Sequence, residues 1–394
     1  MRPIYVIALI AFCQVICVGA NFTTLKFYSE SFGGTGLMVG LLWVGLTMPR
    51  AVLSPMWGSL SDRWGRRPIL VVGSIGSILG SLIWWQAGSY GTLLTSRVVD
   101  SLLGAQATIA FSVIADCTTP ERRAAGMGMV GGLVLLGFTI GPAVGGLVSS
   151  AWGFAPLGLV MACIQSVGLL LILFALPETR PESAAVRAAA SWLPEAFHVT
   201  AWRALLGAPG MAAMLVVSLV VMASYAVYNT AFPNQAVSWF TWNQRDLVPA
   251  FMILGIGGAI AQGGLVRVLV PRFGEARLVI GGGIVMIAAF LVLSLRLPAP
   301  ALLAATGMLA LGGGVAFPCI TALLSRLTPN DRQGLLLGIN QMAQGLGRGF
   351  GFLAGSAFES ISLRLPWWIA VTALGTVLVL MRIAVPERHA KRRQ

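Results

Sequence analysis

Long apolar runs alternate with short polar segments along almost the whole chain. A helix needs about 20 mostly apolar residues to cross a bilayer, and we find twelve runs of about this length. We therefore predict an all-α membrane protein with twelve transmembrane helices. The predicted spans are residues 3–25, 37–59, 68–87, 91–114, 124–150, 155–176, 209–231, 247–270, 277–297, 299–325, 334–358 and 363–384.

The first apolar run allows two interpretations. Arg2 precedes it and Val18-Gly19-Ala20 lies within it, a pattern that also suits a cleaved signal peptide. The run continues to about Leu25, which is long enough to span. We therefore predict that it stays in the protein as the first transmembrane helix.

A polar stretch from Pro177 to about Leu205 divides the spans six and six. We predict an N-terminal six-helix half over residues 1–176, a cytoplasmic linker over 177–206, and a C-terminal six-helix half over 207–394 that ends in a basic cytoplasmic tail. Short basic turns that contain glycine follow span 2 and span 8, the same place in each half. Two similar halves around a central site are a common plan of secondary transporters.

Composition supports a membrane protein and excludes a soluble one. Only 10% of the residues are charged, against about 25% in soluble proteins. The net charge of +13 comes mostly from arginines at the ends of apolar runs. Such an excess marks the cytoplasmic side, so we predict that both termini are cytoplasmic. The same arrangement argues for the lipid bilayer and against nucleic acid as a partner.

Residues suited to catalysis or metal binding are few. Both histidines, His198 and His389, lie outside the predicted spans, and none of the five cysteines forms a Cys-x-x-Cys pair. The sequence contains no Gly-x4-Gly-Lys-Ser/Thr loop for ATP. We therefore expect no enzyme activity, no metal, no cofactor and no ATP-driven pump.

The loop after span 2 reads Gly58-Ser-Leu-Ser-Asp62-Arg63-Trp-Gly65-Arg66-Arg67. Gly65 permits a tight backbone reversal, and Asp62 can pair with Arg63 or with a helix N-terminus. The loop resembles the Gly-x-Leu-x-Asp-Arg-x-Gly-Arg-Arg signature of the Major Facilitator Superfamily. The resemblance implies a gating role for Gly58, Asp62, Arg63, Gly65, Arg66 and Arg67, together with Asp116 after span 4.

Span 5 carries a second pattern. Gly137, Gly141 and Gly145 recur every fourth residue and form a smooth stripe on one helical face, which lets another helix approach closely. Pro142 removes a backbone hydrogen bond and bends the helix. The pattern resembles the antiporter motif of the family's drug–proton antiporter branch, which mostly exports. Its positions here are Gly128, Gly137, Gly141, Pro142, Gly145 and Gly146.

Further stretches extend the resemblance over essentially the whole chain. Ile114-Ala-Asp116 resembles the family's link after span 4, and Leu176-Pro-Glu178-Thr179 resembles its exit from span 6. Residues 317–334 are similar to the span 10–11 region of tetracycline-efflux proteins. The resemblance implies the Major Facilitator fold, alternating access, and a bacterial inner membrane as the location. We expect a monomer.

Two arginines lie deep within predicted spans, Arg50 in span 2 and Arg348 in span 11. A charge at mid-bilayer costs at least about 2.5–3.5 kcal/mol, so it usually faces a cavity or a partner. The resemblance places these spans opposite each other, and an arginine fork suits carboxylate or phosphate. We interpret the pair as a site for an anionic substrate; contacts with backbone carbonyls or a gating role are the alternatives.

Five polar residues are candidate companions of the two arginines at the substrate site. Each of them can instead be a hydrogen bond between helices. They are Gln14, Asn21, Asn340, Gln341 and Gln344.

Span 4 holds Arg97 and Asp100, three residues apart on one helical face, where they can pair. Arg97 matches the arginine of the family's span-4 motif, which the resemblance associates with proton coupling, whereas Asp100 departs from that motif. A buried carboxyl beside a cation feels opposing influences on its pKa. We therefore interpret Asp100 as the proton carrier, with a static ion pair as the alternative.

The first span contains no acid between Ala11 and Cys17, although the family's drug exporters often have one there. This absence weakens the case for export of cationic drugs. Lys26 and Glu30 follow at the outer end of the span, where we expect both to be solvated.

The sequence thus predicts proton-coupled export of a small anionic or zwitterionic molecule, such as a siderophore, a carboxylated metabolite or a tetracycline-like drug. Uptake of an organic anion is the main alternative, because it would use the same fold and the same arginines. A non-transporting membrane sensor is a further alternative, against which the intact loop after span 2 argues.

Overall fold

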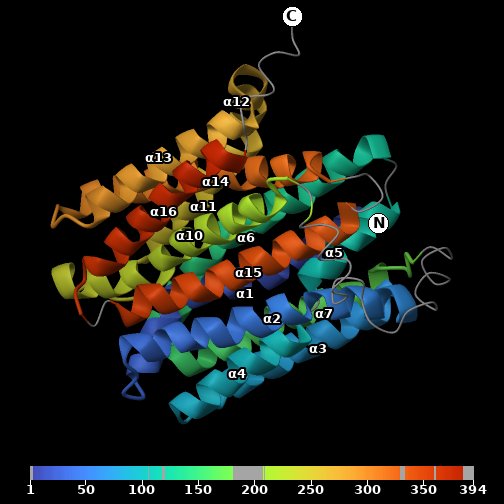
Figure 1. Ribbon diagram of the computed structural model, residues 1–394. Coiled ribbons are helices and arrows are strands. Elements are labelled where there is room, and N and C mark those ends of the chain that lie inside the picture. Colours follow the sequence, from blue (N-terminus) through green and yellow to red (C-terminus); the bar gives the residue numbers. More distant parts are fainter. Residues whose placement is uncertain are drawn as a thin grey trace, which may run out of the picture. The chain divides into compact units, whose positions relative to one another are not determined.

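The computed structural model describes residues 3–104, 106–117, 120–180, 207, 209–328, 333–358 and 361–384, and this part of the chain is helical without strands (Figure 1). Its helices are α1 (Pro3–Glu30), α2 (Gly36–Trp64), α3 (Arg66–Trp85), α4 (Tyr90–Leu103), α5 (Gln106–Cys117), α6 (Pro120–Trp152), α7 (Phe154–Ala175), α10 (Met211–Phe240), α11 (Val248–Ile260), α12 (Val266–Phe273), α13 (Glu275–Leu293), α14 (Ala299–Arg326), α15 (Gln333–Ala357) and α16 (Leu365–Ala384).

Each of the twelve predicted spans coincides with one helix or with successive helices, which confirms the predicted fold class. Among the described residues, nine helices are long and apolar enough to cross a membrane. The other three predicted spans do not meet this criterion, each for its own reason. Span 4 is divided between α4 and α5, span 11 (α15) carries a polar face, and the apolar stretch of α16 is only Leu365–Met381.

Contacts group the chain into two compact units. The first comprises Met1–Pro194 and Phe232–Ile256, and the second comprises Glu195–Ala231 and Gly257–Gln394. The predicted linker, residues 177–206, lies mostly outside the described residues, and the domain boundaries stay a prediction. The hairpin Phe232–Ile256 comprises the end of α10, the loop that follows it and the start of α11, and it groups with the first unit. The sequence did not indicate this arrangement.

In the first unit, α1 packs against α6 and α7, while α3 packs against α4 and α7. The predicted glycine stripe on α6 explains the first of these contacts. A Cβ added at Gly141 would lie 2.6 Å from the carbonyl oxygen of Ile16 and 2.7 Å from Cα of Gly19, both backbone atoms of α1. The stripe therefore serves helix packing as predicted; its role in antiport stays a prediction.

The second unit repeats this arrangement. Gly347, Gly351 and Gly355 recur every fourth residue along α15, and a Cβ at any of them would clash with the α10 backbone or with Thr230. The pairs α1–α6 and α10–α15 occupy corresponding places in the two predicted halves. The internal repeat thus extends from the loops to the helix packing.

Two predicted spans are interrupted. Span 4 breaks at Gly104, between the end of α4 and the start of α5. Span 8 contains a π-helical turn, η2 (Ala261–Leu265), between α11 and α12. Breaks of this kind free backbone groups within a membrane, and other parts of the protein must then satisfy them.

Candidate functional site

A buried polar cluster surrounds Asp100 in the first unit. Asp100, on α4, is 7% exposed. Its Oδ1 accepts a hydrogen bond from Ser77 Oγ of α3 at 2.7 Å and lies 3.3 Å from Nη2 of Arg50 on α2. Three helices thus bring one carboxylate, one guanidinium and one hydroxyl together inside the unit.

Ser77 holds the carboxylate of Asp100 with its only hydroxyl hydrogen. The side-chain amides of Gln14 and Gln106 donate to Ser77 Oγ at 2.9 and 3.3 Å. A serine hydroxyl has one hydrogen and two acceptor positions. With both acceptor positions taken, Ser77 must direct its hydrogen to Asp100.

Arg50 has a second contact and an unused donor. Its Nη2 also donates to the backbone carbonyl of Asp100 at 3.3 Å, and its backbone N–H donates to Ser101 Oγ at 3.0 Å. Its Nε is buried and has no acceptor among the described residues. Contact with a backbone carbonyl, one of the alternatives considered for Arg50, is therefore present. The side chain of Arg50 nevertheless keeps 26% of its surface exposed.

The predicted pairing of Arg97 with Asp100 is wrong. Arg97 is 2% exposed and donates to Asn21 Oδ1 and to Ser96 Oγ, each at 3.1 Å. Its guanidinium carbon lies 4.5 Å from the centre of the Trp84 ring, a cation–π contact. Asn21 and Ser96, rather than the carboxylate of Asp100, therefore accept the hydrogen bonds of the guanidinium. Asn21, predicted to contact substrate, is itself 2% exposed and orients Arg97 instead.

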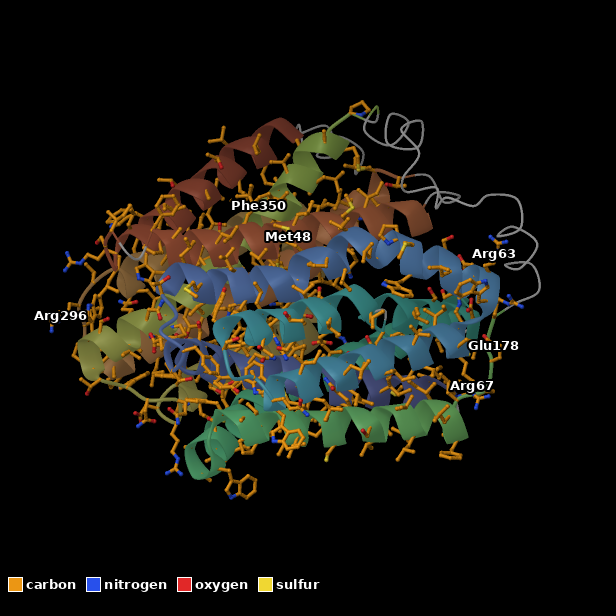
Figure 2. All side chains as sticks on the ribbon, turned by 90° about the horizontal axis from the view of Figure 1, so that it is seen from below. Met48, Arg63, Arg67, Glu178, Arg296 and Phe350 are labelled. Atoms are coloured by element: carbon orange, nitrogen blue, oxygen red, sulfur yellow. The ribbon has the colours of Figure 1, made fainter. Side chains whose placement is uncertain are left out.

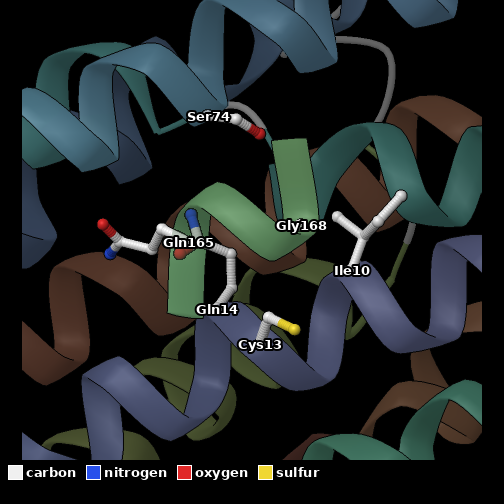
Figure 3. Close-up of a pocket in the computed structure, with 6 residues that line it drawn as sticks. All are labelled: Ile10, Cys13, Gln14, Ser74, Gln165 and Gly168. Atoms are coloured by element: carbon white, nitrogen blue, oxygen red, sulfur yellow. The ribbon is translucent and has the colours of Figure 1, made fainter. Parts of the chain in front are cut away.

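A small cavity lies beside this cluster, between α1, α3 and α7 (Figure 3). Its volume of about 10 Å³ matches a single water molecule and is far below that of a site for a drug-sized ligand. The cavity is therefore excluded as the substrate site. It is lined by Ile10, Cys13, Gln14, Ser74, Gln165 and Gly168.

The second unit presents a polar stripe along α15. Gln341, Gln344 and Arg348 are spaced by three and four residues and so share a helical face. Gln341 and Arg348 are exposed, while Gln344 is half-buried. Arg348 Nε lies 3.4 Å from Sδ of Met222 on α10. An exposed charge in the middle of a span usually faces a water-filled cavity rather than lipid.

Asn340 lies on the adjoining face of α15 and is buried at 3% exposure. It accepts a hydrogen bond from Ser218 Oγ at 2.6 Å and donates to Thr321 Oγ1 at 3.4 Å. It therefore joins α10, α14 and α15, which is the helix–helix alternative considered for this residue.

The loop between α2 and α3 forms an ion-pair network with Arg66 at its centre. Arg66 pairs with Asp116 at the end of α5, at 3.0 Å, and with Asp62 on α2. The partner that the structure shows for Asp62 is thus Arg66, which lies in the first turn of α3. Gly58 accepts from Ser61 Oγ and lies within α2.

Glu178 occupies the N-terminus of α3, and it lies with Arg63 and Arg67 at one end of the bundle (Figure 2). Its carboxylate accepts the backbone N–H of Arg66 at 2.9 Å and of Arg67 at 3.1 Å. Gly65 has φ +106°, which L side chains rarely adopt, and the carboxylate lies directly beside it. The turn therefore needs glycine at this position.

The pKa of Glu178 follows from this position. Burial raises the pKa of the carboxyl, but hydrogen bonds from four backbone N–H groups, those of Arg180, Arg66, Arg67 and Thr179, outweigh burial and lower the pKa below its ordinary value. Glu178 is therefore held as an anion where the α3 dipole favours one.

The remaining predicted residues are placed as follows. Lys26 is 7% exposed and pairs with Glu30, so the expectation that it is solvated was wrong. A Cβ at Gly146 would meet Val248 of the Phe232–Ile256 hairpin. Gly128 lies within α6, and Pro142 accepts at its carbonyl oxygen from Thr23 Oγ1 at 3.1 Å.

Sequence reasoning missed several members of the cluster. Ser77 belongs to a row with Ser74 and Ser81, spaced three and four residues apart and all buried, and that spacing is a readable signal. Gln106 and Trp84 carry no comparable signal. Their partners come from other helices and depend on how α3 and α4 pack.

Nine long apolar helices among the described residues, with charged groups held inside a helical unit, are characteristic of a polytopic membrane protein. The chain belongs to the Major Facilitator Superfamily, whose sequence model matches residues 7–299 and 268–394. It is thus a multi-pass membrane transporter, as the loop and glycine motifs predicted.

Named relatives agree with this assignment. The class C tetracycline resistance protein of Escherichia coli is 28% identical over 305 residues, which cover 76% of this chain and 74% of that protein. Multidrug resistance protein 1 of Bacillus subtilis (strain 168) is 25% identical over 363 residues, covering 91% and 90%. The crystal structure of the human organic anion transporter MFSD10 (TETRAN) has a TM-score of 0.76 over 98% of this chain and 99% of that one, at 19% identity, which shows the shared fold.

Proposed function

We propose that the protein exports a small zwitterionic molecule from a bacterial cell in exchange for protons, by alternating access in the inner membrane with both termini cytoplasmic. The ion pair between Arg50 and Asp100 carries this proposal. It joins the one acid of the buried cluster to an arginine that retains an unused donor. Its two members supply a proton carrier and an anion-binding group at one place.

The charges of the pair favour a zwitterion as the exported molecule. A cationic group of the substrate competes with the proton for Asp100, while an anionic group binds Arg50. Proton and substrate therefore exclude each other, which is what exchange requires. Among the relatives, proteins named for tetracycline and multidrug resistance support export as the direction.

A purely anionic substrate would give the opposite coupling. Protonation of Asp100 leaves the charge of Arg50 uncompensated, so the proton and the anion bind better together than apart. By linkage each raises the affinity for the other. This is the basis of the second candidate function, uptake of an organic anion together with a proton. The structural likeness to an organic anion transporter is a reason to test this function as well.

Arg348 serves in this proposal as the anion-binding group of the second unit, with Gln341 and Gln344 on the same face of α15. A carboxylate or phosphate takes two parallel hydrogen bonds from an arginine fork. The stripe suits the acidic end of a siderophore, a carboxylated metabolite or a tetracycline-like drug.

The experiment is a binding and transport series with purified protein. Zwitterionic and anionic members of a panel of siderophores, carboxylates and drugs are titrated between pH 5 and 8, and then tested in proteoliposomes under an imposed pH gradient. Exchange predicts weaker substrate binding at low pH and proton flow opposite to the substrate. Tighter binding at low pH, with proton and substrate moving together, establishes the uptake function instead. Absence of any gradient-driven transport across the panel contradicts both.

A further inference from the structure

The break in span 4 leaves the carbonyl end of a half-helix inside the first unit. α4 ends at Leu103, Gly104 has φ −71° and ψ 70°, and α5 begins at Gln106. The last carbonyls of a helix lack partners within the helix. Within a membrane, other protein groups must satisfy them.

Helix α2 supplies the missing donors. Arg50 Nη2 donates to the carbonyl of Asp100 at 3.3 Å, and Trp57 Nε1 donates to the carbonyl of Leu102 at 3.0 Å. The backbone N–H of Arg50 donates to Ser101 Oγ at 3.0 Å. The guanidinium therefore lies at the negative end of the α4 dipole, where a cation is stabilised even without the Asp100 carboxylate.

Gly104 provides the room for this cation. Its φ and ψ match an inverse γ-turn, which L residues adopt without strain, so the backbone conformation does not require glycine. Space does. A Cβ at residue 104 would lie 2.5 Å from Arg50 Nε, 2.6 Å from Nη2 and 2.8 Å from Cζ. The guanidinium packs directly on the Gly104 backbone.

We propose that the break in span 4 is a receptor for a guanidinium ion, formed by the backbone carbonyl of Asp100 in the last turn of α4 and by the bare backbone of Gly104. Gly104 is a positioning residue for Arg50. Two attachments hold the guanidinium, the receptor and the Asp100 carboxylate. When a proton neutralises Asp100, the receptor keeps Arg50 in place, so the arginine stays aligned through the protonation step.

Chemical rescue tests the receptor with purified protein in detergent and no substrate. Arg50→Ala opens the receptor and should lower the melting temperature. Millimolar methylguanidinium should restore part of the loss, whereas methylammonium at equal concentration, which matches its charge, should not. Gly104→Ala in the Arg50→Ala background should abolish the rescue, because the new methyl group occupies the place of the ion. Equal effects of the two cations, or rescue that persists with Gly104→Ala, would overturn the proposal.

A double-mutant cycle decides the question if Arg50→Ala does not accumulate. Gly104→Ala should lower the melting temperature by about 1–2.5 °C, the effect of about 1–2 kcal/mol in a chain of this size, and should have little further effect in Arg50→Gln. Gly91→Ala is the matched control on α4, since its nearest neighbour, Ser89 Oγ, lies 3.8 Å away. Additive effects of Gly104→Ala and Arg50→Gln would contradict a role through Arg50.

Both readouts are independent of transport. If no substrate of the panel is transported, the proposed guanidinium receptor is unaffected. If methylguanidinium does not rescue Arg50→Ala, the proposed exchange reaction is still tested by the transport series.

Discussion

Nη2 of Arg50 lies 3.3 Å from the carboxylate of Asp100. The pair joins the middle of α2 to the last turn of α4 within the first unit. A proton that neutralises Asp100 weakens one of the two hydrogen bonds of Nη2 and removes the negative charge that balances Arg50. This link between a proton and an anion-binding group is the basis of the proposed coupling.

The two arginines are expected to be essential for transport and dispensable for insertion. Each contributes charge-assisted hydrogen bonds, so Arg50→Gln or Arg348→Gln should lower substrate affinity roughly tenfold to a hundredfold. Binding to purified variants measures the loss, and membrane yield reports insertion. Arg296→Gln, at an exposed loop, is the matched control. Wild-type affinity in both variants would end the anion-site interpretation.

The glycine stripe on α6 is expected to control stability. Gly141→Ala places a methyl group 2.6 Å from the backbone of α1, which cannot yield without moving the helix. Overpacking of this kind costs about 1–3 kcal/mol, and the melting temperature in detergent should fall accordingly. Gly131→Ala on the same helix meets no atom within 4 Å and should leave it unchanged. Equal melting temperatures for the two variants would show that the close approach of α1 and α6 at Gly141 does not contribute to stability.

Glu178 is expected to stabilise the loop between α2 and α3 in a pH-dependent way. The pKa of its carboxyl in the folded protein is lowered, so its contribution is present above the ordinary value of about 4.3 and is lost as the pH falls through the lowered folded value. Glu178→Gln should therefore have a lower melting temperature than the parent protein at pH 7. The difference should shrink below about pH 4.

The measurement is a series of melting temperatures for both proteins from pH 7 to pH 3. A difference that is constant across the series would show that the carboxylate charge does not hold the α3 N-terminus.

The positions of the spans and the stripe on α6 could be predicted because each depends on a local sequence pattern, an apolar run or a glycine at every fourth position. The stripe on α15, formed by Gly347, Gly351 and Gly355, has the same spacing and is equally readable in the sequence, although it was not among the predictions.

Pairing between charged residues could not be predicted in the same way. Arg97 and Asp100 share a face of α4, yet Trp84 and Asn21 contact the guanidinium and Arg50 reaches the carboxylate from α2. These partners depend on tertiary packing, in particular on the close approach of α3 and α4 at Gly80, where a Cβ would lie 2.8 Å from Cβ of Asp100. The break at Gly104 was not predicted because a single glycine inside a helical pattern does not by itself indicate the end of a helix.

The central claim is that Asp100 carries the exchanged proton, and Asp100→Asn tests it most directly. The variant and the parent protein are reconstituted with a pH-sensitive dye inside the vesicles, and proton flux and substrate movement are recorded together, with Asp246→Asn in an exposed loop as the control. We predict that Asp100→Asn binds the substrate as weakly as the parent protein does at low pH, exchanges labelled for unlabelled substrate only at raised substrate concentration, and no longer accumulates substrate against a gradient or moves protons. Proton flux equal to that of the parent protein, at equal substrate transport, would contradict the account.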